Sequence, residues 1–189
     1  MTLASYISCL RIVLIVPIIY FLHLGEGHEF SGSGPNIYFY FAFSLFVMAG
    51  LTDYLDGYIA RKLNTETQLG ALLDLIADKL LVSLIMVWLV FIEHTVAVAI
   101  PALIIFAREL VISTLRQYVI EKRGNKEISV SFIGKSKTTI QIIAISMLIL
   151  AQEITSIYTL ALIAIWFAAL FSLYSLFMYV SEWSKDYLN

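Results

Sequence analysis

Six long apolar runs account for most of this 189-residue chain. They lie at about 3–24, 37–61, 70–92, 96–121, 134–152 and 155–180, with short polar stretches between them. A helix needs about 20 apolar residues to cross the hydrocarbon core of a bilayer. Hydrophobic residues make up 60% of the chain and charged residues 14%, a balance that is not found in soluble globular proteins. The pattern predicts an all-α integral membrane protein, folded as a six-transmembrane-helix bundle in a single domain, 1–189.

Charge and cysteine content exclude some classes of function. The net charge of -2 gives no reason to expect nucleic acid as a partner. The single cysteine, Cys9, has no second thiol in the chain with which to form a disulfide.

The positions of the basic residues predict how the bundle is oriented. Lysine and arginine are missing from the connections at 25–36, 93–95 and 152–155, and they crowd the connections at 61–62 and 122–137. Basic loops stay on the cytoplasmic side of a membrane. We therefore expect both termini at the cytoplasmic face of the cell (inner) membrane, and a flexible external loop over Gly25–Pro35, where glycines cluster.

Four aspartates in this apolar setting point to chemistry. Asp53 and Asp56 close the second run, and Asp74 and Asp78 open the third. Ionised carboxylates in or near hydrocarbon are costly unless they are paired, bind a metal or line a polar cavity. The orientation above places all four at the cytoplasmic end, where we expect a cavity that opens to the cytoplasm.

Helical periodicity brings these carboxylates together. At about 100° per residue, Asp53 shares one narrow face with Gly57 and Ala60, and Asp56 lies about 60° to the side. Gly70, Asp74 and Asp78 stack one turn apart on the third helix. The residues at 62–69 suffice for a turn between antiparallel neighbours, so the two faces are expected to meet across a gap.

Such a cluster fits divalent metal ions. Oxygen ligands suit hard cations such as Mg²⁺ or Mn²⁺, and two of these ions would neutralise four carboxylates. The small residues Gly57, Ala60 and Gly70 leave space beside the carboxylates, and a nucleotide would fit in that space.

These residues also form a known signature. The run Asp53-x-x-Asp56-Gly57-x-x-Ala60-Arg61, then eight residues, then Gly70-x-x-x-Asp74-x-x-x-Asp78 resembles the signature of the CDP-alcohol phosphatidyltransferases. The resemblance implies that the aspartates Asp53, Asp56 and Asp74 hold two divalent ions that grip the diphosphate of a CDP-linked lipid. It further implies that Asp78 joins the metal site and acts as the base, and that Gly57, Ala60, Arg61 and Gly70 bind the CDP moiety.

The second half of the chain predicts the acceptor alcohol. Arg108, Glu109 and Arg116 lie in one apolar run, and Lys135 and Lys137 open the next. This arrangement is similar to bacterial phosphatidylglycerophosphate synthases within the family, whose acceptor is sn-glycerol 3-phosphate. Arg108 and Arg116 lie about 80° apart and can border one cavity, whereas the two lysines would point about 200° apart if both are helical. We therefore expect at most one lysine to touch substrate, unless the helix begins between them.

Ser8 and Arg11 match a Thr-x-x-Arg element near the amino terminus of the same family, with serine in place of threonine. The resemblance makes both residues candidate substrate contacts. It also favours a homodimer, with CDP-diacylglycerol and membrane lipid as further partners.

Several alternatives remain open at this point. A cardiolipin synthase or an inositol-phosphate transferase of the same fold would use another acceptor, and four aspartates also suit an ion-coupled transporter. Arg108 and Glu109 would form a structural ion pair in the simplest reading, although adjacent helical residues do not face each other. Glu109 would otherwise brace a cation on the first or the fifth helix.

Overall fold

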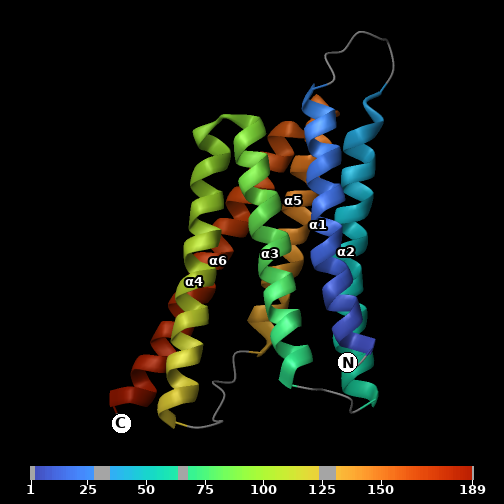
Figure 1. Ribbon diagram of the computed structural model, residues 1–189. Helices are drawn as coiled ribbons and strands as arrows, with labels where there is room; N and C mark the ends of the chain where they lie inside the picture. Colours follow the sequence, from blue (N-terminus) through green and yellow to red (C-terminus); the bar gives the residue numbers. More distant parts are fainter. Residues whose placement is uncertain (1–2, 28–34, 64–67, 124–130, 189) are drawn as a thin grey trace.

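The structure is a computed structural model in which all regular structure of the described residues is helical (Figure 1). It describes the backbone of residues 3–27, 35–63, 68–123 and 131–188. Within these ranges it does not describe the side chains at 3–5, 53–63, 68–69, 71, 116, 119–123, 131–136, 182 and 185–188.

The helices follow the predicted apolar runs closely. They are α1 (Leu3–Gly27), α2 (Ile37–Leu63), α3 (Gln68–Glu93), α4 (Val96–Arg123), α5 (Ser131–Ala151) and α6 (Tyr158–Leu188), with a 3₁₀ turn, η1 (Thr155–Ile157), before α6. The largest difference is at α6, which continues to Leu188. The prediction of an all-helical protein with these elements is confirmed for the described part of the chain.

Within the described part of the chain, four helices are long and apolar enough to cross a membrane. The candidate spans are Tyr6–Gly27, Leu72–Glu93, Val96–Leu115 and Thr155–Ser181. The described apolar segments of α2 and α5, Ile37–Thr52 and Lys137–Ala151, are shorter. The chain is therefore an integral membrane protein with four candidate spans, and six crossings stay a prediction.

A core of aliphatic side chains holds the helices together. Helix α1 packs against both α2 and α3, and α6 packs against both α4 and α5. Ile18 and Leu22 of α1, Phe46 of α2 and Ile85 of α3 are fully buried in this core. On α6, small residues such as Ala161 and Ala168 are buried, which suits close approach of helices in a membrane protein.

Helices α3 and α4 leave a space between them. They are joined by a tight turn at His94, whose φ of 48° is left-handed and whose N–H donates to the Val90 carbonyl at 3.2 Å. Such a residue commonly ends a helix. From this turn the two helices diverge, so their far ends lie well apart (Figure 1). At that same end α1 begins and α6 ends (Figure 1).

The prediction of a loop from Gly25 onward is wrong at its first residues, because α1 continues through Gly27. The amide of Asn36 donates to the Gly25 carbonyl at 2.8 Å, which satisfies one of the last carbonyls of the helix. A Cβ on Gly25 would lie 2.8 Å from the Phe39 ring, so glycine there permits close packing of α2 on α1. Residues 28–34 lie outside the described part.

Candidate active site

Helix α1 supplies a cation to one of the predicted metal ligands. Arg11 Nη1 lies 3.2 Å from Asp74 Oδ1, and the Ser8 hydroxyl donates to the same oxygen at 3.4 Å. The Arg11 side chain is fully buried, whereas that of Asp74 is 47% exposed. The pair therefore fixes the carboxylate from one side and leaves it accessible to a ligand. Ser8 and Arg11, which the family resemblance makes candidate substrate contacts, both lie against Asp74.

Asp74 and Asp78 project from the same side of α3. This helix is continuous from Gln68 to Glu93, so Gly70, Asp74 and Asp78 lie one turn apart as predicted. Gly70 is buried, and both aspartates are partly exposed. Carboxylate oxygens suit hard divalent cations, but among the described residues no three His, Cys, Asp or Glu side chains gather closely enough to hold an ion, so the metal site stays a prediction.

The rest of the predicted metal and nucleotide site belongs to the last three turns of α2. The side chains of this part, Asp53, Asp56, Gly57, Ala60 and Arg61, lie outside the described residues. The meeting of four carboxylates therefore stays a prediction.

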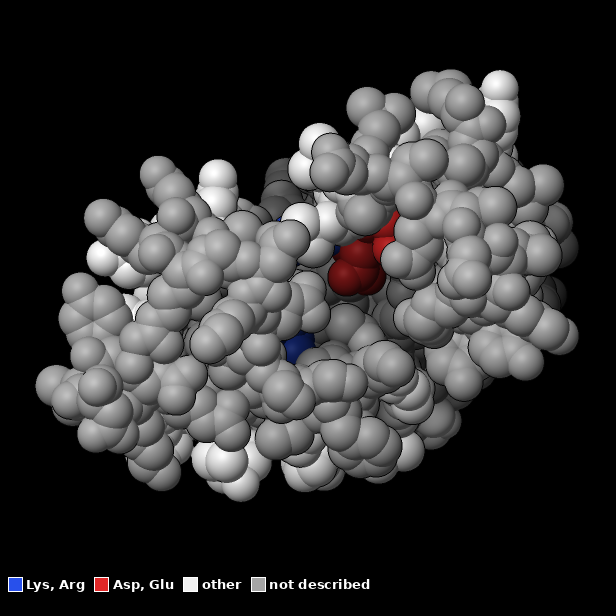
Figure 2. All heavy atoms as spheres, turned by 90° about the horizontal axis from the view of Figure 1, so that it is seen from below, with Lys and Arg blue, Asp and Glu red and all other residues white. Residues whose placement is uncertain are grey.

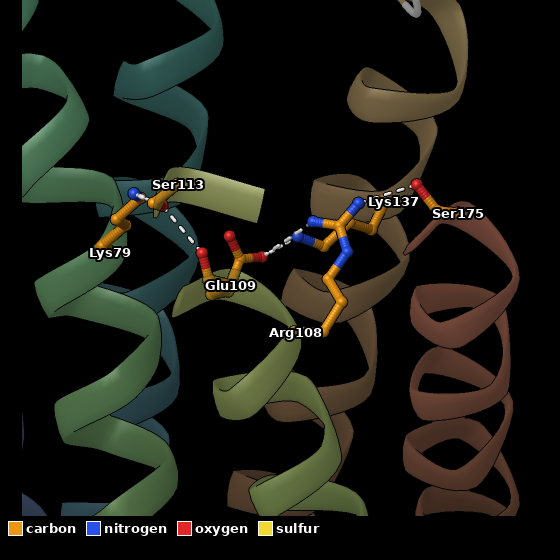
Figure 3. A network of polar contacts seen from close by, with 6 residues as sticks. All are labelled: Lys79, Arg108, Glu109, Ser113, Lys137 and Ser175. Carbon is orange, nitrogen blue, oxygen red and sulfur yellow. Dashed lines mark hydrogen bonds and ion pairs between the residues drawn. The ribbon is translucent and has the colours of Figure 1, made fainter. Parts of the chain in front are cut away.

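A second polar cluster joins α4, α5 and α6 (Figure 3). Arg108 Nη1 lies 3.4 Å from Glu109 Oε1, and Lys137 Nζ contacts the same oxygen. Arg108 Nη2 also donates to the Ser175 hydroxyl at 2.7 Å. The side chains of Arg108 and Lys137 are 7% and 3% exposed, so two cations are buried around one carboxylate.

This cluster shows which cations Glu109 contacts, and the bounds of α5 show whether that helix begins between the two lysines. Glu109 pairs with Lys137 on the fifth helix, and it also contacts its neighbour Arg108, contrary to the expectation for adjacent helical residues. The contact forms because both long side chains bend toward Lys137 (Figure 3). Since α5 begins at Ser131, the backbone at both Lys135 and Lys137 is helical, so the helix does not begin between them. The side chains of Lys135 and Arg116 lie outside the described part.

A hydrogen-bonded pair, Lys79 and Ser113, connects α3 to this cluster. Lys79 Nζ donates to the Ser113 hydroxyl, and that hydroxyl donates to the Glu109 backbone carbonyl at 2.7 Å. Glu109 thus lies between Lys79 and Ser113 on one side and the buried cations on the other (Figure 3).

A cavity of about 310 Å³ lies where α3 and α4 diverge, with α5 behind it. Its polar lining includes Asp78, Lys79, Glu109 and Gln141, and the rest is largely apolar, from Val82 to Val90 on α3 and from Ala99 to Phe106 on α4. Seen from the end where α3 begins, acidic and basic side chains lie inside a hollow between the helices (Figure 2). The cavity therefore joins a charged mouth to an apolar interior.

Sequence reasoning missed four polar residues here: Lys79, Ser113, Gln141 and Ser175. Gln141 is 1% exposed and lines the cavity, and its amide nitrogen has no hydrogen-bond partner among the described residues. Lys79 follows Asp78 directly, and Gln141 lies one turn after Lys137. Closeness in sequence to a predicted site residue could therefore have identified Lys79 and Gln141.

Comparisons with known proteins agree with this arrangement. The sequence model of the CDP-alcohol phosphatidyltransferase family matches residues 1–174. Among similar proteins are the CDP-diacylglycerol–glycerol-3-phosphate 3-phosphatidyltransferases of Escherichia coli (strain K12), Shigella sonnei (strain Ss046) and Salmonella choleraesuis (strain SC-B67). Each is 40% identical over 146 residues, which is 77% of this chain and 79% of the relative.

Proposed function

Because the chain belongs to the CDP-alcohol phosphatidyltransferase family, we propose that it transfers the phosphatidyl group of CDP-diacylglycerol to sn-glycerol 3-phosphate, giving phosphatidylglycerophosphate and CMP. It is an enzyme of phospholipid biosynthesis. Its similarity to relatives named for this reaction extends over most of the chain.

One structural observation supports the choice of acceptor most directly. Two buried cations, Arg108 and Lys137, pair with Glu109, which lines the same cavity as Asp78. A phosphate-bearing alcohol can bind its phosphate to the cations while its hydroxyl reaches the aspartate. A neutral alcohol would gain nothing from the cations. Arg116 completes the proposed phosphate site, with Lys137 as the one lysine of the pair expected to touch substrate, because α5 begins before both Lys135 and Lys137.

The donor binds at the junction of α2 and α3. Four aspartates, Asp53, Asp56, Asp74 and Asp78, would hold two divalent cations, Mg²⁺ or Mn²⁺, and these ions when bound would offset the charge of the diphosphate and of departing CMP. Beside them, Gly57, Ala60, Arg61 and Gly70 accommodate the cytidine. Ser8 and Arg11 keep Asp74 in place, and the apolar part of the cavity suits the hydrocarbon of a lipid.

The transfer step needs one base and one leaving group. A hydroxyl oxygen of glycerol 3-phosphate attacks the phosphorus of the phosphatidyl group as Asp78 accepts the hydroxyl proton. The bond from that phosphorus to the bridging oxygen breaks in line, and CMP leaves with the electron pair. Asp78 is suited to this role because it lines the same cavity as Glu109, the carboxylate that pairs with the buried cations.

The enzyme lies in the cell (inner) membrane as a six-span bundle, with both termini and the site at the cytoplasmic face. The distribution of lysine and arginine supports this orientation. We further propose a homodimer, since exposed apolar side chains outside the cavity, such as Val16 and Phe177, leave lipid-facing surface for a second copy.

A panel of acceptors tests the proposal. Purified protein is incubated with CDP-diacylglycerol and Mg²⁺ or Mn²⁺, and CMP release is measured with glycerol 3-phosphate, phosphatidylglycerol, inositol phosphate or no acceptor. We expect CMP release with glycerol 3-phosphate. Release with phosphatidylglycerol or inositol phosphate instead would change the acceptor, and no release with any alcohol would favour an ion-coupled transporter.

A further inference from the structure

We propose that Glu109 is an internal counter-ion that competes with the phosphate of the acceptor for Arg108 and Lys137. This inference rests on the proposed function, since it concerns the site at which the acceptor would bind. It gives Glu109 a role that none of the steps above assigns to it: setting how tightly the acceptor is held.

The contacts place one carboxylate where an anion would bind. Oε1 of Glu109 meets Lys137 Nζ and lies 3.4 Å from Arg108 Nη1. The three side chains come from two helices, and Ser175 on a third helix anchors the far side of the Arg108 guanidinium at 2.7 Å. Both cations are therefore held in position around a single negative oxygen.

The Glu109 carboxylate compensates for the lost hydration of the two buried cations. A buried cation is stable only when a negative group or hydrogen bonds compensate for its lost hydration. Lys137 and Arg108 are almost fully buried, whereas Glu109 is 22% exposed and lines the cavity together with Asp78. Glu109 is thus the member of the cluster that an incoming ligand can reach.

A bound phosphate would supply the same compensation. Its oxygens accept charge-assisted hydrogen bonds from lysine and arginine, as a carboxylate does. The phosphate then adds a second negative group beside Glu109, and the two repel each other or share the cations. In the native protein, Glu109 therefore offsets part of the attraction of the two cations for the acceptor phosphate. Removing the charge of Glu109 should make the acceptor bind more tightly.

The test is a comparison of the wild-type enzyme with Glu109→Gln, which keeps the shape and removes the charge. We expect the KM for glycerol 3-phosphate to fall by about tenfold, the size of one charge-assisted contact, with a smaller change in kcat. A scaffold role predicts the opposite, because misplaced cations would raise the KM. An unchanged or raised KM would therefore overturn the proposal.

A binding measurement without turnover gives a second readout. Inorganic phosphate, in the absence of divalent metal, should raise the melting temperature of Glu109→Gln more than that of the wild type, because ligand that binds the folded state stabilises it. Equal shifts in both proteins would contradict the competition. The matched control is Glu26→Gln, which alters an exposed carboxylate near the end of α1 and should match the wild type.

The Glu109→Asp variant covers the case in which Glu109→Gln does not fold. It keeps the charge and withdraws the carboxylate from Lys137, so the KM should fall by a smaller factor, and a raised KM would contradict the proposal. Failure of the proposed function is separate: wild-type protein would then release no CMP with glycerol 3-phosphate, while the phosphate-binding comparison would still test Glu109.

Discussion

Arg11 of α1 and Asp74 of α3 form an ion pair, with Nη1 3.2 Å from Oδ1. The arginine is fully buried and the aspartate is 47% exposed, so the cation is fixed and the carboxylate is presented outward. A group that orients a ligating carboxylate influences metal binding without touching the metal. This relationship gives the amino-terminal helix a part in the proposed chemistry.

Substitution of Arg11 should weaken metal use. In Arg11→Gln the fixed positive charge beside Asp74 is lost, and we expect the Mg²⁺ concentration for half-maximal CMP release to rise by about tenfold or more. Titration of activity with Mg²⁺ measures this. The Ser8→Thr variant keeps the hydroxyl that donates to Asp74 and should titrate like the wild type. An unchanged metal requirement in Arg11→Gln would show that the pair is only structural.

Substitution of Asp78 should separate binding from chemistry. Asp78→Asn retains an oxygen but cannot accept the hydroxyl proton, so turnover should fall at least about a hundredfold. Binding of CDP-diacylglycerol should remain measurable by its effect on the melting temperature. Turnover equal to that of the wild type would refute the role of Asp78 as base.

Substitution of Arg108 should act on the acceptor. Arg108→Ala removes a buried cation from the proposed phosphate site, and the KM for glycerol 3-phosphate should rise about ten- to a hundredfold. Ser175→Ala removes one hydrogen-bond partner of Arg108 and should have a smaller effect in the same direction. Saturation with glycerol 3-phosphate that is the same in Arg108→Ala and the wild type would make Arg108 part of the scaffold.

Packing of α2 on α5 can be tested at Gly50. A Cβ at this position would lie 3.2 Å from two carbon atoms of Ile142, so a larger side chain must displace that residue. Gly50→Leu should lower the free energy of unfolding by about 1–3 kcal/mol, as overpacking of a core does. Thermal unfolding in detergent measures the change. Met48→Leu, on the exposed face of the same helix, should be nearly neutral, and equal stability of the two variants would contradict the packing.

The apolar runs predicted the helices well, because a membrane-spanning helix must be apolar along its length and charged residues mark its ends. They could not reveal that α1 continues through Gly27, since the contacts at Gly25 come from Asn36, just before α2, and from Phe39 within α2. The predicted spacing of Asp74 and Asp78, one turn apart, is found in the structure because both residues lie in one continuous helix.

Contacts between helices were harder to predict. The pattern left three candidate partners for Glu109: Arg108, a cation on the first helix or a cation on the fifth. Only the arrangement of α4 and α5 shows that it meets Lys137. Lys79 and Ser113 are paired across α3 and α4 for the same reason, and neither was identified from the sequence. Periodicity gives the face of a helix on which a residue lies, but not the neighbour that this face meets.

In the proposed reaction, the acceptor hydroxyl displaces CMP from the lipid phosphorus. The most direct measurement uses glycerol 3-phosphate carrying ¹⁸O in its terminal hydroxyl, with purified protein, CDP-diacylglycerol and Mg²⁺, and mass spectrometry of both products. We predict equimolar CMP and phosphatidylglycerophosphate, with the label in the lipid product and none in CMP. Label in CMP, or the absence of phosphatidylglycerophosphate, would contradict the proposed reaction.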